Sequence, residues 1–501
     1  MRLRYTALVA LLIVAGPVLA QTEAKLTDPN GMGGFPGDFF GRTVALSGDG
    51  TVALVGAENK LNLQGAAFIY VQENGTWRLQ AELRAPAPAV IDYFGAAVAL
   101  TRDGTLAFVT SRSFTNPAVH VFERAGDAWT LLTSILPATA TPQDQFGNAL
   151  AVSADGSVVL VGAFLSDAAV SNAGAAYVFT RSGDTWTESA ELTASDAAQL
   201  ALFGQSVALS GDGAYALVGN GFSDDGGAAY VFARSGDAWT EQALFTSDEI
   251  DVSPQFGQSV ALDGDGTTAL VGASSEDGLA SGDGGALYVF TRSGATWARQ
   301  ARLVASDAQA GDQLGFAAAL TPDGRTALGG ANSTTGRPGA AYAFAFDGAT
   351  WMEQATLVPS DGTNNDQFGT AVALSTDGAT ALVGRLLGPN KGPGAAYVFT
   401  GFAVAAEEGP LAQRATLGPA YPNPAPAGGL VRAPLVISEA QSVRVVLYDV
   451  LGRAVRAVDL GVVAPQQTTD VAVPTHGLAP GLYVLRAEGP SITASRRVVV
   501  R

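Results

Sequence analysis

Carboxylates are the main residues in this chain that could carry out acid–base or metal chemistry. The chain has 46 Asp and Glu residues but only two His and no Cys. Because His120 and His476 lie in different parts of the chain, neither a His-based catalytic triad nor a paired-His metal site can be built. The lack of Cys excludes thiol catalysis and thiolate metal ligands. Two carboxylates would suffice to cleave a polysaccharide, but no acidic pair is set apart by its local sequence.

His120 lies in a short apolar stretch, residues 118–122 (AVHVF). Similar stretches elsewhere in the chain have a tyrosine at this place, for example Tyr177 and Tyr230. We therefore expect His120 to replace a packed aromatic side chain rather than to act as a general base.

Many of the acidic residues occur in one short turn that recurs along the chain. Six copies have a single Asp before Gly, whereas residues 263–266 read Asp-Gly-Asp-Gly. Calcium takes about six to eight oxygen ligands, so Asp263 and Asp265 are the candidate calcium ligands of the chain. The turn is short, however, and its composition is also that of a plain hairpin turn, in which Asp bonds the backbone and Gly takes positive φ. The hairpin is the preferred interpretation, and we expect no other cofactor.

These turns belong to a longer repeat that opens with Phe-Gly. Successive openings are separated by roughly 50 to 60 residues, a period typical of propellers and other repeat folds. A complete copy contains four apolar runs of strand length, and the tight turns join the first run to the second and the third to the fourth. The seven openings are Phe40-Gly41, Phe94-Gly95, Phe146-Gly147, Phe203-Gly204, Phe256-Gly257, Leu314-Gly315 and Phe368-Gly369.

Seven units of four strands predict an all-β fold, a seven-bladed β-propeller of four-stranded antiparallel blades at residues 21–402. Runs such as residues 177–179 and 207–209 are apolar at every position, as expected for sheets that are covered on both faces. A two-sheet sandwich is the rival fold, and the seven similar modules argue against it.

The seventh module lacks a fourth strand. In the other modules a Trp, such as Trp297, opens that strand, but none follows the run at residues 394–399. Residues 22–27 resemble the end of a fourth strand instead. We therefore predict that this N-terminal segment pairs with the third strand of the last blade and closes the ring without leaving a long open edge.

The repeated elements FG-x-S-V-A-L-S-x-D-G, A-L-V-G-A and G-A-A-Y-V-F-x-R-S-G resemble bacterial FG-GAP repeats, which are related to the propeller of integrin α-subunits. The resemblance covers residues 22 to about 402 and implies the propeller fold. It implies little about the ligand.

The first residues are typical of a secretory signal peptide, residues 1–20. Arg2 and Arg4 precede an apolar run at residues 7–15, and small residues lead to a cleavage site after Ala20. The run is too short to span a bilayer comfortably, and Gly and Asp interrupt every later candidate, so we expect no transmembrane span in the mature chain.

Residues 403–416 have the composition of a linker, and the segment 417–501 predicts a small antiparallel β-sandwich from its alternating apolar residues and turns. This segment is similar to the type A sorting domain of the bacterial type IX secretion system, although residues 465–468 depart from the family pattern. An ordinary binding sandwich is the alternative. The residues that carry the resemblance are Tyr421, Pro422, Asn423, Pro424, Tyr448, Asp449, Gly452, Arg453, Gly481, Tyr483 and Arg501. The resemblance implies the type IX secretion machinery as a partner and a secreted or outer-surface location in a Gram-negative bacterium.

The formal charge of the chain is −18 at pH 7, and all of the excess negative charge precedes residue 417. An acidic domain repels phosphate backbones, which argues against nucleic acid as a partner.

In the expected propeller, the variable loops after the second and fourth strands emerge on one face, which we call the loop face. Both tight hairpins emerge on the opposite face, the hairpin face. Variable loops are the usual place of function, but most of their acidic residues are expected to be solvated. These acidic residues are Glu58, Asp144, Asp167, Asp224, Asp225, Glu276, Asp277, Asp283, Asp312 and Asp366.

We therefore expect a monomeric, non-catalytic propeller that binds a protein or glycan partner through the loop face. Two alternatives stay open: an extracellular polysaccharide hydrolase or lyase that uses carboxylates in the central channel, and a structural component of a surface layer.

Overall fold

The computed structural model divides the chain into two units, residues 1–404 and 405–501. The expected signal peptide, residues 1–20, lies outside the described residues, and so does most of the expected linker. In the described part of the chain no helix is long and apolar enough to cross a membrane. The described residues are 21–31, 37–221, 226–247, 255–277, 282–333, 336–387, 392–402, 415–417, 421–422, 425–426, 428–437, 441–448, 453–464, 468–489 and 492–501.

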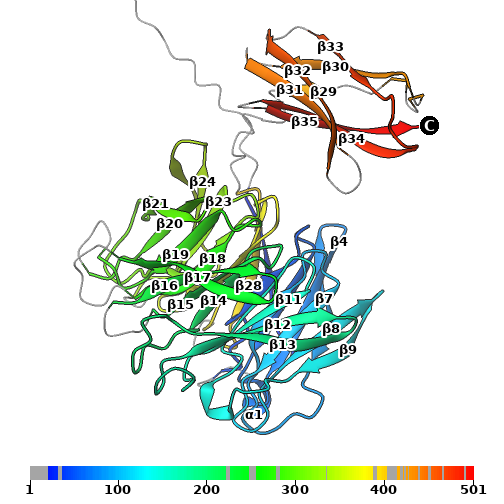
Figure 1. The fold of residues 1–501 in the computed structure, drawn as a ribbon. Helices are drawn as coiled ribbons and strands as arrows, with labels where there is room; N and C mark the ends of the chain where they lie inside the picture. Colours follow the sequence, from blue (N-terminus) through cyan, green and yellow to red (C-terminus); the bar gives the residue numbers. More distant parts are fainter. Residues whose placement is uncertain are drawn as a thin grey trace, which may run out of the picture. The chain divides into compact units, whose positions relative to one another are not determined.

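The first unit consists of seven four-stranded antiparallel sheets (Figure 1). The first sheet contains β2 (Val44–Leu46), β3 (Val52–Ala57), β4 (Ala66–Glu73) and β5 (Thr76–Leu83). The second contains β6 (Phe94–Leu100), β7 (Leu106–Ser111), β8 (Ala118–Ala125) and β9 (Ala128–Ile135). The third contains β10 (Ala149–Val152), β11 (Val158–Ala163), β12 (Ala175–Ser182) and β13 (Thr185–Leu192). The fourth contains β14 (Ser206–Leu209), β15 (Tyr215–Gly219), β16 (Ala228–Ser235) and β17 (Ala238–Thr246).

The fifth sheet contains β18 (Phe256–Leu262), β19 (Thr268–Ala273), β20 (Ala286–Ser293) and β21 (Thr296–Leu303). The sixth contains β22 (Leu314–Leu320), β23 (Thr326–Ala331), β24 (Ala340–Phe346) and β25 (Trp351–Leu357). The seventh contains β26 (Phe368–Leu374), β27 (Thr380–Arg385), β28 (Ala395–Thr400) and β1 (Thr22–Leu26). Two short helical turns, α1 (Lys60–Leu63) and a 3₁₀ turn at Pro142–Asp144, lie in loops.

The innermost strands of the seven sheets form a closed cycle: β2, β6, β10, β14, β18, β22 and β26 each contact the next, and β26 contacts β2. A ring of backbone hydrogen bonds joins their hairpin ends. It runs from Gly48 N–H to Arg102 C=O (2.7 Å) and on through Ala154, Gly211, Gly264 and Pro322, and Thr376 N–H returns to Gly48 C=O (2.8 Å). One link is missing because Pro322 has no N–H to donate. The sheets are thus fastened to one another as well as packed.

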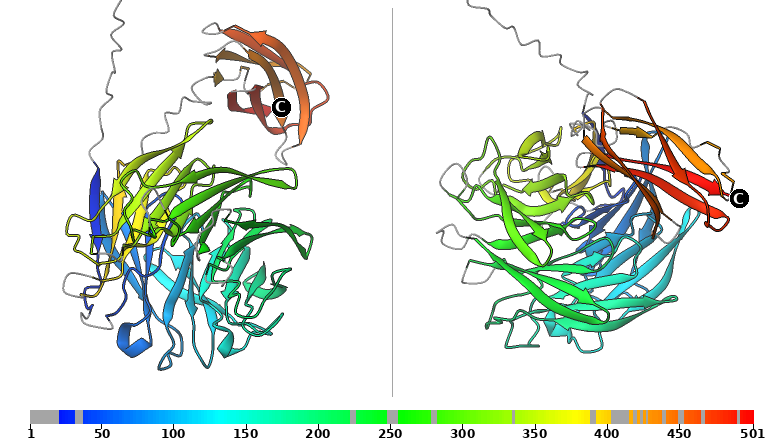
Figure 2. Two further views of the ribbon diagram at one scale, coloured as in Figure 1. Left: turned by 90° about the vertical axis from the view of Figure 1, so that its left-hand side faces the viewer. Right: turned by 45° about the horizontal axis from the view of Figure 1, so that its top comes forward.

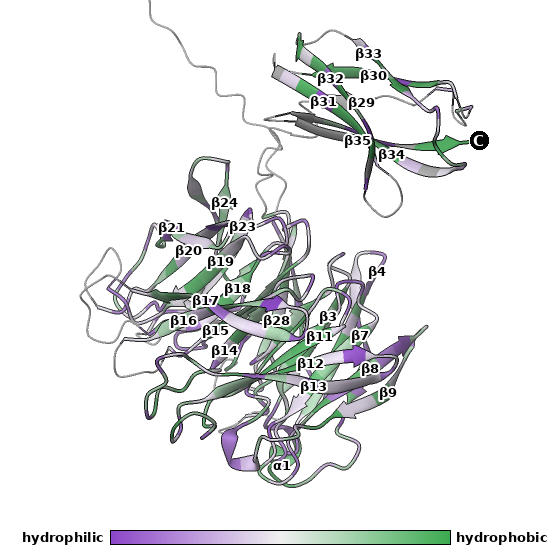
Figure 3. Ribbon diagram, in the orientation of Figure 1, coloured by the Kyte–Doolittle hydropathy of each residue, from purple (hydrophilic) through white to green (hydrophobic). Residues whose placement is uncertain are grey.

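The Phe-Gly opening of each module has a clear packing role. Phe203 is fully buried, and its ring lies 5.3 Å from that of Tyr230 and 6.0 Å from that of Phe232. Gly204 has a φ of 90°, and a Cβ added to it would lie 2.3 Å from the carbonyl oxygen of Ala175. Only glycine therefore fits this close approach of strands. Hydrophobic residues concentrate in the strands in the same way throughout the unit (Figure 3).

The N-terminal strand β1 completes the seventh sheet, next to β28 (Figure 2). The two strands are antiparallel, with Lys25 opposite Tyr397 and Leu26 opposite Ala396. This is the pairing expected for residues 22–27. The open edge of β28 is covered as a result, and the two ends of the repeat region are held in one sheet.

The second unit has two antiparallel sheets that share one hydrophobic core. One contains β29 (Ala415–Leu417), β30 (Leu430–Ile437) and β33 (Thr469–Pro474). The other contains β32 (Ala454–Val463), β31 (Gln441–Tyr448), β34 (Gly481–Gly489) and β35 (Ile492–Val500). Regular structure starts two residues before the expected boundary at residue 417, because Ala415 and Thr416 already pair with β30.

Candidate binding site on the loop face

The sheets of the first unit repeat a polar arrangement under their loops. The third strand presents a tyrosine, and its hydroxyl donates a hydrogen bond to a carboxylate from a neighbouring loop. Four sheets share this contact: Tyr230 with Asp196 (2.9 Å), Tyr288 with Glu276 (2.7 Å), Tyr342 with Asp307 (2.8 Å) and Tyr397 with Asp361 (2.6 Å). The loop face is therefore anchored to the strands below it.

Several loop carboxylates that we expected to be solvated are in fact buried, so that expectation is wrong for them. Asp312 accepts a hydrogen bond from the backbone N–H of Gln309 (2.8 Å), and Asp366 accepts one from that of Thr363 (2.9 Å). Glu276 instead accepts from Tyr288 (2.7 Å), and Glu58 pairs with Arg42 (2.8 Å). The five buried residues are Glu58, Asp144, Glu276, Asp312 and Asp366. Asp167, Asp277 and Asp283 are exposed as expected, and Asp224 and Asp225 lie outside the described residues.

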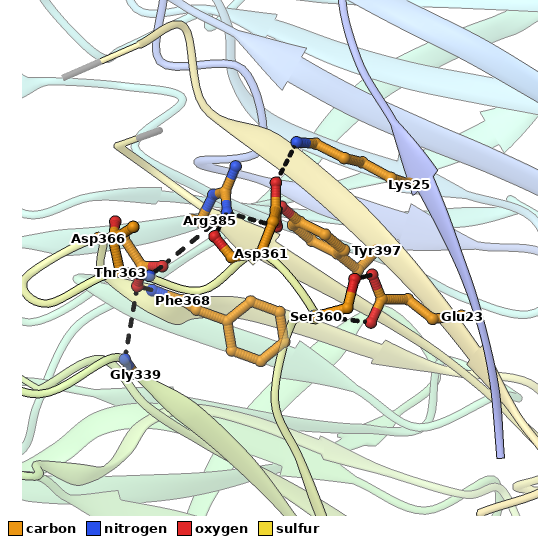
Figure 4. Close-up of polar contacts among 10 residues, drawn as sticks. All are labelled: Glu23, Lys25, Gly339, Ser360, Asp361, Thr363, Asp366, Phe368, Arg385 and Tyr397. Carbon is orange, nitrogen blue, oxygen red and sulfur yellow. Dashed lines mark hydrogen bonds and ion pairs between the residues drawn. The ribbon is translucent and has the colours of Figure 1, made fainter. Parts of the chain in front are cut away.

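In the seventh sheet a buried cation neutralises this arrangement (Figure 4). Arg385 is 1% exposed, and its Nη1 lies 2.9 Å from Asp361 and 3.9 Å from Asp366. Its guanidinium also lies over the ring of Tyr397, 5.0 Å from the ring centre. Lys25 of β1 adds a second cation, 2.5 Å from Asp361. Burial tends to raise the pKa of Asp361, but the hydrogen bonds from Lys25 and Tyr397 and the charge of Arg385 outweigh it and hold that pKa well below its usual range.

The sixth sheet has the same acids and tyrosine but not the buried arginine. Ala331 occupies the place of Arg385, because it is paired with Leu314 and Ala340 as Arg385 is paired with Phe368 and Ala395. A cavity of about 260 Å³ results. Its lining includes Asp307, Asp312, Ala331, Ser333, Arg337, Tyr342 and, from the next loop, Thr356, Val358, Pro359, Ser360 and Gly362.

Two features of this cavity, which we call the sixth-sheet pocket, distinguish it from a packing defect. Ser333, which lines the pocket, is 2% exposed, and its buried hydroxyl has no hydrogen-bond partner among the residues that the structure describes. The charges are also unbalanced, since the one guanidinium of Arg337 lies 2.9 Å from Asp312 and 3.8 Å from Asp307. Burial and the bond to Asp307 raise the pKa of Tyr342, so its hydroxyl stays protonated. The pocket thus has a net negative charge and an unused hydroxyl.

His120 occupies a packed aromatic position in β8. Its ring is 6% exposed and lies 5.6 Å from that of Phe94, and the two nitrogens contact the hydroxyls of Ser134 (2.8 Å) and Ser111 (3.2 Å). Burial lowers the pKa of His120 to about 4. The histidine is therefore neutral at physiological pH.

Asp263 and Asp265 lie together in one hairpin turn, where both accept hydrogen bonds from Thr267. The Thr267 hydroxyl lies 2.9 Å from Asp263 and 2.7 Å from Asp265. Within the described residues no group of three or more His, Cys, Asp or Glu side chains is arranged to hold a metal. Calcium binding at this turn stays the less favoured alternative to a plain hairpin turn.

The hairpin face has a second cavity, of about 170 Å³, at the mouth of the central ring. Its rim includes one aliphatic residue from each innermost strand, and its charged lining residues are Arg102 and Asp263.

The sorting-motif residues are partly described. Tyr421 donates its hydroxyl to Asp470 (2.8 Å) and exchanges two backbone bonds with Arg432, and Tyr483 is buried with its hydroxyl bonded to the carbonyl of Ala479 (2.8 Å). Tyr448 ends β31, Gly481 begins β34, and Pro422, Arg453 and Arg501 lie outside regular strands. Asn423, Pro424, Asp449 and Gly452 lie outside the described residues.

Two family models match the chain. The FG-GAP repeat matches residues 21–70, 129–179, 186–232, 239–290, 297–344 and 351–399, which together exceed half of the chain. The secretion system C-terminal sorting domain matches residues 419–501. The chain is thus a repeat protein with a C-terminal secretion domain. It belongs to the FG-GAP repeat family. The tail shows that the protein is secreted or lies on the cell surface and involves the type IX secretion system.

The matched repeats are offset from the sheets. The segment 21–70, for example, begins with β1 of the seventh sheet and ends within β4 of the first. Each sequence repeat therefore contributes the fourth strand of one sheet and three strands of the next, which links consecutive sheets covalently. The second sheet, whose Phe94-Gly95 opening lies outside the matched segments, has the same strand order as the others.

No curated protein matches the chain significantly. Similar solved structures include the β-propeller domain of Cps50 (Swd1) from Myceliophteria thermophila (9% identity, 76% of this chain and 99% of that one, TM-score 0.49). A putative 6-phosphogluconolactonase from Bacteroides uniformis has 14% identity over 84% of this chain and 100% of that one, with a TM-score of 0.47. Hydrazine synthase from Kuenenia stuttgartiensis has 14% identity over 69% and 92%, with a TM-score of 0.45. Likenesses at this level carry no argument about function.

Proposed function

We propose that the chain folds as a seven-bladed β-propeller followed by a small β-sandwich, and that the propeller binds an extracellular protein or glycan through its loop face without catalysing a reaction. The closed cycle of innermost strands supports the propeller, and the core shared by two sheets supports the sandwich. We further propose that the protein acts as a monomer.

The observation that carries the binding role is the sixth-sheet pocket. It opens among loops on the face where the modules differ most, and it combines charged groups with the unused hydroxyl of Ser333. Concave sites with a few convergent polar groups are the usual form of a ligand site. The acids Asp307 and Asp312 both lie near Arg337, at 3.8 and 2.9 Å.

The test uses the mature chain and two matched substitutions. Val358 lines the pocket and is 51% exposed, and Leu131 is a 40% exposed residue of β9 that does not line it. A partner found on a glycan array or by pull-down from the extracellular fraction should be lost with Val358→Arg and retained with Leu131→Arg. Equal binding by both variants would mean that the partner binds outside the sixth-sheet pocket. Release of reducing ends from a polysaccharide would contradict the non-catalytic role.

A further inference from the structure

The internal repeat shows what kind of group suits the sixth-sheet pocket. In the seventh sheet the equivalent space is filled by Arg385, which pairs with Asp361 and Asp366 and lies over Tyr397. Asp307, Asp312 and Tyr342 correspond to these three residues in the sixth sheet, and Ala331 corresponds to Arg385. The pocket therefore lacks the buried arginine of the seventh sheet, and its one guanidinium is that of Arg337, whose side chain is 36% exposed.

The first sheet also holds a buried cation beside a loop carboxylate and an aromatic ring, but the cation is a lysine. Lys60 is 5% exposed, forms an ion pair with Asp28, and has its Nζ 5.3 Å from the centre of the Phe68 ring. Phe68 stands opposite Val55 as Tyr342 stands opposite Gly329, so it occupies the tyrosine position of its sheet. Two sheets thus place a buried cation between a loop carboxylate and the aromatic ring of the third strand.

The remaining groups of the pocket match a cation as well. Two carboxylates face the single guanidinium of Arg337, which is bonded to Asp312 at 2.9 and 3.2 Å but lies 3.8 Å from Asp307. The charge of Asp307 is therefore incompletely paired. A guanidinium or ammonium group has only donors and can pair with it. At about 260 Å³ the pocket suits a side chain or a small molecule rather than a large ligand.

Building on the loop-face binding role proposed above, we infer that the sixth-sheet pocket binds a guanidinium or alkylammonium group. Asp307, whose side chain is 53% exposed, is the counter-ion of that group. Such a group is found both in arginine and lysine side chains of a protein partner and in free small amines.

The experiment compares a charged probe with a neutral probe of the same shape. N-acetyl-arginine methylamide should bind the mature chain saturably in calorimetry, and the citrulline analogue should bind at least about tenfold more weakly, because it lacks the charge. A short peptide with one arginine and its citrulline version form a second pair. Peptide binding about tenfold tighter than the free derivative identifies a protein partner, and equal affinity identifies a free small cation.

Two substitutions place the binding in this pocket. Ala331→Arg supplies the side chain that the seventh sheet already has, so it should abolish probe binding and leave the melting temperature unchanged or higher. Asp307→Asn keeps the pocket open and should weaken the arginine probe at least about tenfold, whereas Asp167→Asn, an exposed acid in a loop of the third sheet, should have no effect.

Three results would overturn the inference: no binding of the arginine probe, equal binding of arginine and citrulline probes, or full binding by Ala331→Arg. The loop-face role is judged separately. A glycan or protein partner lost with Val358→Arg but insensitive to Asp307→Asn would retain that role and reject the cation.

Discussion

Glu23 accepts hydrogen bonds from both the backbone N–H and the hydroxyl of Ser360, each 2.9 Å long. The two residues belong to opposite ends of the repeat region. Glu241 accepts the same two bonds from Ser195, and Glu353 accepts them from Ser306. In each pair, the glutamate is on a fourth strand and the serine is on the loop that follows the preceding fourth strand. The strand β1 thus substitutes in detail for the missing fourth strand of the seventh sheet.

Removing the packing of β1 should destabilise the whole first unit. Leu26 is 2% exposed and belongs to a core cluster shared by the first and seventh sheets. Leu26→Ala should lower the free energy of unfolding by about 2–4 kcal/mol because it leaves a cavity in that core. Denaturant unfolding of the mature chain measures this change. Thr22→Ala, on the exposed end of β1, is the control. A loss no larger than that of the control would mean that β1 does not secure the ring.

His120 should make the fold sensitive to acid. Its pKa is about 4 in the folded chain and about 6.5 when unfolded, so the unfolded state binds more protons below pH 6.5. The neutral, buried His120 costs no stability above pH 6.5. As the pH falls from 6.5 to 4, the free energy of unfolding decreases by about 3 kcal/mol. His120→Tyr introduces the residue found at this place in five other sheets. The difference in unfolding free energy between this variant and the parent chain should change with pH only between about 4 and 6.5. A difference that does not depend on pH would contradict the assigned burial effect.

The turn with two carboxylates should behave as a hairpin rather than as a calcium site. Asp263 replaces the hydroxyl that in the other turns donates to the following aspartate, as Ser47 does to Asp49 (2.6 Å). Burial raises the pKa of Asp263, so its charge is costly. Asp263→Ser should therefore stabilise the chain at pH 7 by about 1 kcal/mol, measured by thermal unfolding.

Calcium titration of the unmodified chain is the complementary measurement. It should give no saturable heat, because Asp263 and Asp265 already share the hydroxyl of Thr267. Saturable heat that disappears in Asp263→Ser would instead establish a calcium site there.

Export should depend on the second unit. Deletion of residues from Leu417 onward removes most of the strands of this unit and the basic end of the chain. The shortened protein should accumulate in the periplasm of its host, as seen by cell fractionation. Its melting transition serves as the control for folding of the first unit, and normal delivery to the surface would contradict the role of the sorting domain.

Much of the fold could be predicted from local sequence because the determinants are local. Each module opens with a buried apolar residue, Phe in six modules and Leu314 in the sixth, followed by a glycine with positive φ, so the spacing of these openings reports the number of sheets. Lys25 and Leu26 resemble the end of other fourth strands, which made the position of β1 predictable too.

The burial of the loop acids could not be predicted from local sequence. Asp312 and Asp366 are in loops and acidic, features that normally indicate solvation. They are buried because each bonds the backbone of its own loop, while Arg337 approaches from the loop after β23 or Arg385 from the end of β27. Neither contact leaves a periodic pattern in the sequence.

By itself, the sequence determined the repeated module, the export signals and the absence of thiol or paired-histidine chemistry, because these depend on residue types at short spacing. Only the tertiary structure decided which loop acids are paired with an arginine and which are exposed to solvent. Ala331 and Arg385 end equivalent strands, but the contacts of Arg385 with Asp361 and Asp366, and of Arg337 with Asp312, join residues about 20 or more positions apart, so only the fold shows them.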